Sequence, residues 1–271
     1  MPSFTGKAFA NFYKNILGIN QASNTGVDAT TRAVHDGAGN SSALSLSDDV
    51  LQVQPVNDDT TGAMLVKNSG GSNILAVDTT NSKVLAGASQ VAVNTQYTHF
   101  GSDYGNTAGF TADTYHAINF HSADTIYTGY LTLGSSTSSS FNDTEPATST
   151  TISTTGHVDI QKFWYVMDDI TIDRVIWWQG ADTATGDSTV AYLMGYTVDA
   201  TAGSTGGDLS SGTKLASSSV ITNAGYEQSY YNQMTIHSAD VDAGKVILFA
   251  FASDTVNSDY TISVTIKFRI R

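Results

Sequence analysis

The chain has 271 residues, enough for one large or two modest domains with a core that needs no disulfide bonds. It contains no cysteine, which excludes disulfides, thiolate nucleophiles, zinc–thiolate sites and iron–sulfur clusters. The net charge of −13 argues against nucleic acid and anionic membranes as partners, because both repel such a surface. The longest apolar run, 246–252, is far shorter than the roughly 20 residues that span a bilayer. The N-terminus has no apolar signal region, so we expect a soluble protein without a signal peptide.

The composition predicts a mainly β protein. Ser and Thr account for 67 residues, and 23 of the 25 acidic residues are aspartates, a combination typical of strands and turns. A helical protein would use glutamate far more often.

The segment 1–19 is predicted to form an amphipathic helix that ends at Gly18. Such a short helix is marginal in water, so its apolar face must dock on something. The surface could be the chain's own sheet, but we favour a larger assembly because the next 80 residues contribute little core. The predicted anchor consists of the apolar residues Phe9, Phe12, Tyr13, Ile16 and Leu17.

The segment 20–95 is predicted to be a stalk of short strands at 43–47, 50–54, 63–67, 73–77 and 83–86. Asp-, Asn- and Gly-rich turns separate these strands. Each strand offers two or three apolar side chains, too few to offset the ordering entropy of a monomer. Three copies wrapped about one axis would supply the missing core, so we expect a homotrimer.

The segment 96–271 is predicted to be a C-terminal antiparallel β-sandwich, jelly-roll-like, without helices. The expected strands are 115–121, 125–133, 157–166, 170–179, 189–198, 214–221, 228–236, 245–252 and 260–270. The last strand alternates without error between apolar and polar residues, which predicts a central strand with one face in the core. Phe163, Trp164, Tyr165, Trp177 and Trp178 are the expected centre of the core.

Motifs for catalysis or cofactor binding are missing from the sequence. His116 and His121 are five residues apart, so on one strand they would point to opposite faces and could not share a metal. Asp168 and Asp169 fit a hairpin turn better than a catalytic pair, although turn aspartates could also bind calcium. We therefore predict no enzymatic activity, no cofactor and no catalytic or metal site.

Three turn-rich segments, at 24–28, 31–40 and 42–47, follow one another closely, and residues 73–87 form a strand, a polar turn and a returning strand. This part of the chain, about 12–87, resembles the N-terminal part of fibre and appendage proteins of tailed bacteriophages. The resemblance implies a homotrimer on the virion surface, with an N-terminal anchor, a β-structured stalk and a globular tip. The chain is too short for a long tail fibre and lacks the β-helix-sized body of a tailspike depolymerase, which favours a small appendage.

The leading hypothesis is therefore a structural virion protein, either a capsid decoration (head fibre) or a short tail fibre. Its expected partners are other copies of itself and capsid or tail proteins. The alternative is a carbohydrate- or receptor-binding module for host attachment, and a polysaccharide-degrading spike enzyme ranks last. The candidate ligand contacts are the aromatic residues Trp177, Trp178, Tyr226, Tyr230 and Tyr231. Trp177 and Trp178 are neighbours, so one must face inward and the other outward.

Overall fold

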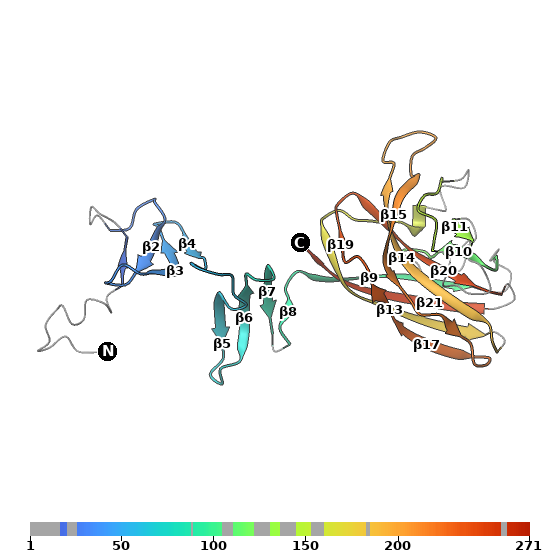
Figure 1. Cartoon of the computed structure of the whole chain (residues 1–271), viewed down its shortest axis with the longest axis horizontal. Coiled ribbons are helices and arrows are strands. Elements are labelled where there is room, and N and C mark those ends of the chain that lie inside the picture. Colours follow the sequence, from blue (N-terminus) through green and yellow to red (C-terminus); the bar gives the residue numbers. More distant parts are fainter. Residues whose placement is uncertain are drawn as a thin grey trace, which may run out of the picture. The chain divides into compact units, whose positions relative to one another are not determined.

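The structure, a computed structural model, describes residues 17–20, 26–87, 89–104, 111–121, 131–135, 145–152, 160–182, 185–255 and 259–271. The chain divides into two compact units, Met1–Asn94 and Thr95–Arg271, and each is built from antiparallel strands (Figure 1). No helix in the described ranges is long and apolar enough to cross a membrane.

The first unit contains two separate four-stranded sheets, each with its strands in sequential order. The first sheet consists of β1 (Gly18–Ile19), β2 (Arg32–His35), β3 (Ser41–Leu46) and β4 (Leu51–Val53). The second consists of β5 (Met64–Lys67), β6 (Asn73–Asp78), β7 (Lys83–Ala86) and β8 (Val91–Ala92).

Short polar side chains close the turns of both sheets. Asp36 accepts hydrogen bonds from the backbone N–H groups of Ala38 and Asn40, which fixes the turn between β2 and β3. Asp78 does the same for the turn after β6, where the N–H of Asn81 donates to its carboxylate at 2.9 Å. These hydrogen bonds, with the Asn40 and Asn81 side chains foremost, lower the pKa of both aspartates.

The first unit has almost no core of its own. Of its described apolar side chains, only Val34 and Ala76 are buried. In the second sheet, register places Met64, Val66, Leu75, Val77, Val84 and Val91 on one face and Leu65, Ile74, Ala76 and Leu85 on the other. Both faces of this sheet are therefore apolar, and most of these side chains are exposed or half-buried.

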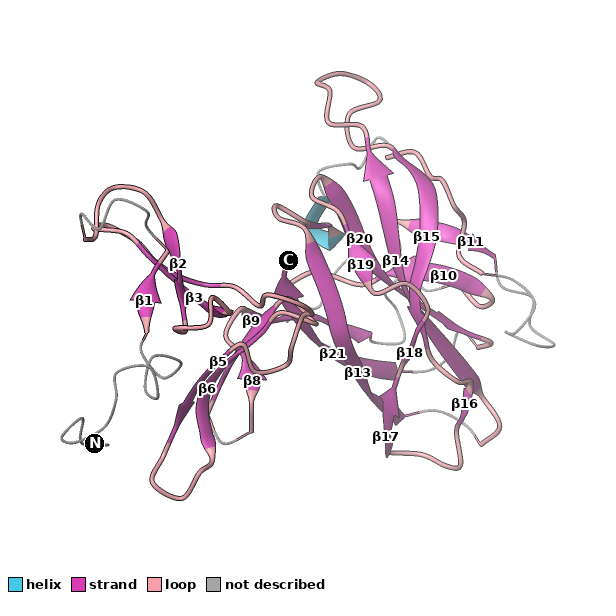
Figure 2. Cartoon of the chain, turned by 60° about the vertical axis from the view of Figure 1, so that its left-hand side comes forward, coloured by secondary structure: helices cyan, strands magenta, loops and turns pink. Residues whose placement is uncertain are grey.

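The second unit contains two larger sheets (Figure 2). The five-stranded sheet has the order β17–β13–β21–β9, with β19 also paired to β13. Its strands are β9 (Thr95–Tyr104), β13 (Ile170–Asp182), β17 (Gln228–Gln233), β19 (Asp240–Val241) and β21 (Asp259–Ile270).

The eight-stranded sheet has the order β11–β10–β20–β14–β15–β18, with β12 paired to β20 and β16 to β14. Its strands are β10 (Thr114–Ala117), β11 (Thr132–Ser135), β12 (Trp164–Tyr165), β14 (Ser188–Val198), β15 (Leu209–Ser217), β16 (Ile221–Thr222), β18 (Thr235–Ile236) and β20 (Lys245–Ser253).

The main core lies between these two sheets and makes the unit a β-sandwich. Trp177 of β13 is fully buried and lies edge-on to Phe249 and Phe251 of β20, with ring centroids 6.2 and 6.0 Å apart. Between the sheets, Thr189 also donates a hydrogen bond to Gln179, at 2.7 Å. The expected antiparallel β architecture is thus confirmed.

A second apolar cluster covers the opposite face of the eight-stranded sheet. It includes Tyr115, Tyr192, Tyr196 and Leu248, so the central strands β14 and β20 are buried on both faces. The segment 145–152 crosses this face: Tyr196 donates a hydrogen bond to the carbonyl of Ala147, and Thr150 forms a bridge with Leu209. We call this segment the strap.

Several expectations are corrected by the structure. Residues 157–159 of the expected strand 157–166 lie outside the described residues, and its described part forms a 3-10 turn, η3 (Ile160–Lys162), and the two-residue β12 instead. Asp168 and Asp169 do not form a hairpin turn, because β12 belongs to one sheet and β13 to the other. Strand β9 was not expected, since Phe100 is its one fully buried apolar side chain among those described.

The end of the N-terminal segment differs from expectation, whereas the strand order of the sandwich agrees with it. The predicted helix lies outside the described residues except at its end, where Gly18 and Ile19 form β1 instead of a helix terminus. In the sandwich, the nested strand pairs are β9–β21, β10–β20, β13–β17 and β14–β15. These pairs alternate between the two sheets, which is the strand arrangement of a jelly roll.

Candidate ligand-binding face

The outer face of the five-stranded sheet carries the exposed aromatic side chains of β13 and β17. Alternation along β13 turns Val175 and Trp177 into the core and Ile176 and Trp178 outward. Trp178 is 51% exposed although Trp177 is completely buried. This inward–outward division of the two tryptophans is the one that their adjacency predicts.

Trp178 and Tyr231 form an exposed aromatic pair. They are register partners on β13 and β17, and their ring centroids lie 5.2 Å apart in an edge-to-face arrangement. Tyr231 is 49% exposed, so both residues keep ring surface open to solvent. Half-exposed rings of this kind suit the apolar face of a sugar or of a partner side chain.

Arg174 extends the aromatic pair with a fixed cationic group. Its Nη2 atom donates hydrogen bonds to the Tyr231 hydroxyl oxygen at 3.2 Å and to Gln233 Oε1 at 2.6 Å. Both partners are neutral, so these hydrogen bonds orient the guanidinium without cancelling its charge.

A shallow cavity of ≈ 250 Å³ lies on the other side of Trp178 along β13. Its lining includes Gly180, Thr261 and the acidic residues Asp182 and Glu227. Gly180 is the next outward position after Trp178, and its missing side chain leaves room above the sheet. The outer face thus combines an aromatic pair, a cationic end and an acidic, hollowed end.

The structure removes two of the five predicted ligand contacts. Trp177 lies in the core, because its position on β13 faces the opposite sheet. Tyr230 packs against the same core, and its hydroxyl bonds Asn223 Oδ1 and the N–H of Ala224, each at 2.7 Å. Tyr230 therefore fixes the connection before β17 and cannot stack on a ligand. Tyr226, in the same connection, is 67% exposed and stays a candidate contact.

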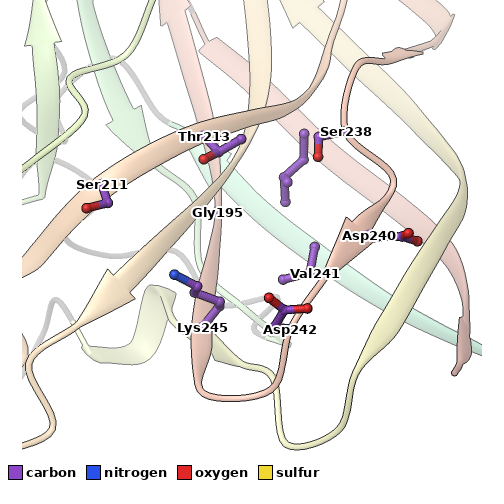
Figure 3. A pocket seen from close by; sticks show the side chains of 9 residues that line it. Gly195, Ser211, Thr213, Ser238, Asp240, Val241, Asp242 and Lys245 are labelled. Carbon is purple, nitrogen blue, oxygen red and sulfur yellow. The ribbon is translucent and has the colours of Figure 1, made fainter.

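A polar pocket of ≈ 180 Å³ lies elsewhere in the sandwich (Figure 3). Figure 3 shows Ser211, Thr213, Asp242 and Lys245 among the residues that line it. Its charged groups already have partners inside the protein: Lys245 donates to Thr197 at 2.6 Å and Arg271 to Asp242 at 2.8 Å. Because these charged groups are already engaged, the pocket is a weaker candidate binding site than the outer face.

The histidines form one close pair. His99 of β9 and His121 have ring centroids 4.7 Å apart, and His121 Nε2 lies 3.0 Å from Thr98 Oγ1. Burial, reinforced by the nearby His99, lowers the pKa of His121. His116 is buried on β10, whereas His121 lies beyond the end of that strand, so the two histidines do not share the strand expected at 115–121.

The described residues contain no group of three or more His, Asp or Glu side chains that could hold a metal ion. Asp169, one of the two aspartates considered for catalysis or calcium binding, accepts a hydrogen bond from the N–H of Ala243. Asp173, close by on β13, forms an ion pair with Arg269.

The predicted anchor residues Phe9, Phe12, Tyr13 and Ile16 lie outside the described residues. Leu17 is described and is 71% exposed, with no regular secondary structure. The anchor therefore stays a prediction.

Two comparisons with known proteins found no relative. No protein-family model matches the sequence, and the search of curated proteins found no match. The functional interpretation accordingly depends on the residues and their geometry.

Proposed function

We propose that the protein is a homotrimeric surface appendage of a tailed-phage particle, anchored by its N-terminus, with the sandwich outward. The observation that carries this proposal is the apolar character of both faces of the β5–β8 sheet. Isolated, this sheet would leave Met64, Leu65, Val66 and Ile74 at least 42% exposed. Burial of such surface contributes about 25 cal/mol per Å², so a monomeric form forgoes substantial stabilisation.

Two apolar faces favour a trimer over a dimer. In a closed threefold ring each chain touches a preceding and a following copy, so both faces of one sheet can be covered. A twofold dimer uses the same patch on both chains and would cover one face. The resemblance of residues 12–87 to phage fibre proteins supports the same assembly.

The place on the particle has two alternatives, a capsid decoration or head fibre and a short tail fibre. Electron microscopy of intact particles labelled with an antibody against the sandwich separates them. Label on the head supports decoration, label on the tail supports a fibre, and particles without label contradict the virion role.

The anchor is tested by deleting residues 1–16, which leaves β1 intact. We expect the shortened chain to remain a folded trimer that no longer joins particles. Incorporation at normal occupancy would place the anchor elsewhere in the chain.

A second function, host attachment through a surface carbohydrate, is favoured by one specific observation. Trp178 and Tyr231 expose ring surface side by side on a rigid sheet. If this face mediates adsorption, Trp178→Ser should reduce binding of particles to cells while leaving their protein composition unchanged. Unchanged adsorption would favour a purely structural role.

A further inference from the structure

Two basic side chains stand directly opposite each other on the outer face of the five-stranded sheet. Arg174 and Lys267 are register partners on β13 and β21. Both project outward, because their neighbours Val175 and Ile266 are buried in the core. Directly opposite residues on adjacent strands have Cβ atoms about 5 Å apart, and like charges at this distance destabilise the sheet.

Neither charge is neutralised within the described part of the chain. Arg174 bonds the neutral groups of Tyr231 and Gln233, and Lys267 has no ion-pair partner among the described residues. The nearest acid along β13, Asp173, is paired with Arg269. From there to Asp182, the outward positions of β13, β17 and β21 carry no acidic side chain.

This arrangement is unusual for so acidic a chain. The protein has 25 acidic and 12 basic residues, so a neutralising neighbour would be easy to supply. A local arrangement that costs stability without an internal compensation is expected mainly at functional sites. The compensation would then come from a ligand that carries negative charge.

We propose that the outer face of the five-stranded sheet binds an acidic polysaccharide, with carboxylate groups at Arg174 and Lys267 and a sugar ring stacked on Trp178. Tyr231 joins the two parts, since it is the ring partner of Trp178 and accepts a hydrogen bond from Arg174. The polymer is expected to run from Trp178 over the cationic end and away from the cavity over Gly180, because Asp182 and Glu227 in that cavity repel carboxylate groups. This inference rests on the host-attachment function and specifies its ligand class.

The other candidate for this face is a second copy of the chain. Stable interfaces between identical subunits have cores that are more apolar than the rest of the surface. Around Trp178 this face presents the half-buried Ile176 and several small or hydroxyl-bearing residues, namely Gly180, Thr261, Ser263 and Thr265. Such a surface fits the hydroxyl groups of a sugar better than a desolvated protein interface.

The test uses the full-length protein with two probes of equal length, a galacturonic acid hexasaccharide and a neutral galactose hexasaccharide. Titration calorimetry at low and at physiological salt gives both affinities. We expect the acidic probe to bind at least tenfold more tightly than the neutral one, and to weaken as salt is raised. Binding of neither probe, or equal binding of both, overturns the proposal.

Two variants assign the binding to this face. Lys267→Gln should weaken binding of the acidic probe about tenfold, and Trp178→Ser should abolish it. Lys67→Gln removes one positive charge from β5 of the first unit and should leave the affinity unchanged. If Lys267→Gln has no more effect than Lys67→Gln, the proposed cationic site is wrong.

Stability and mass measurements separate the remaining explanations. Lys267→Gln removes a like-charge pair, so its melting temperature should equal or exceed that of the wild type. A lower melting temperature, or dissociation of the oligomer by Trp178→Ser, would make the face an interface between copies and overturn the proposal. Probe binding does not depend on attachment to a particle. A negative result would therefore overturn the proposed ligand without bearing on the appendage role, which the antibody-labelling experiment tests.

Discussion

Adjacent residues of β13 have opposite roles, and substitution should separate them. Trp177 contacts Phe249 and Phe251 across the core, so Trp177→Ala should lower the free energy of unfolding by about 3–5 kcal/mol. Trp178 is half exposed, and Trp178→Ala should cost less than about 1 kcal/mol. Denaturant unfolding of the two variants checks this. Equal losses would contradict the register of β13.

The carboxyl group of Asp254 links stability to pH. Burial, together with the charges of Asp187 and Asp113, raises its pKa, although the N–H of Ser188 donates to it and opposes the shift. Because the pKa in the folded state lies above the unfolded value of 3.8, the folded protein binds this proton more tightly than the unfolded chain does. The resulting stabilisation is complete below pH 3.8 and is lost as pH rises through the folded-state pKa. Asp254 therefore destabilises the folded protein at neutral pH.

The expected consequence is that Asp254→Asn stabilises the protein at pH 7. The amide oxygen can still accept the hydrogen bond from Ser188, while the buried charge is gone. Melting temperatures across pH 3–7 should show the advantage shrinking as pH falls, because the wild-type carboxyl group becomes protonated in both states. An advantage independent of pH would show that the charge is not the cause.

At the scale of elements, β21 is the central strand of its sheet, between β13 and β9. Ile266 is fully buried, while its neighbour Thr265 faces outward and is exposed. Ile266→Asp should therefore place a charge in the core, cost several kcal/mol and unfold the sandwich. Thr265→Asp should be tolerated. Circular dichroism melts of both variants test the alternation, and a stable Ile266→Asp variant would refute it.

The strap depends on a glycine in β15. A side chain at Gly212 would meet Thr148 Cα at 2.8 Å and Tyr196 Cε1 at 2.7 Å. Gly212→Ala should push the strap away from the sheet and cost about 1–3 kcal/mol. Gly225→Ala, which meets no atom within 4 Å, is the matched control. Faster hydrogen exchange at Leu209 and Thr150 in the first variant alone would confirm the expected displacement.

The sequence predicts strands best where alternation or turn chemistry is strong. The expected strands 73–77, 83–86, 245–252 and 260–270 each differ from β6, β7, β20 and β21 by at most one residue at either end. Strand β9 escapes prediction because its neighbours, rather than its own polar sequence, make it a strand. The expected strand 157–166 misleads because, in its described part, only Trp164 and Tyr165 pair as a strand, while η3 before them exposes Ile160 and buries Lys162 against Asn119.

The candidate site was predictable in part. Adjacency predicts that one tryptophan of 177 and 178 faces outward, but only packing shows which one. Tyr231 could be named from its aromatic character, whereas its pairing with Trp178 depends on the register between β13 and β17, strands that lie 45 residues apart. The opposition of Arg174 and Lys267 likewise depends on a bulge at β13, which no local pattern reveals.

At the scale of the whole molecule, the two units contrast in how they are stabilised. The sandwich has two apolar clusters, one on each face of the eight-stranded sheet. The described part of the first unit buries only Val34 and Ala76 among its apolar side chains. The first unit should therefore acquire its stability from other copies, which makes the assembly state the central claim.

The mass of the full-length protein in solution tests this claim most directly. Sedimentation equilibrium over a hundredfold range of concentration should give three times the chain mass of 28.6 kDa, with no dissociation on dilution. Met64→Asp, on one apolar face of the β5–β8 sheet, should shift this mass downward while the sandwich stays folded. A wild-type protein that sediments as a stable, fully folded monomer would contradict the account.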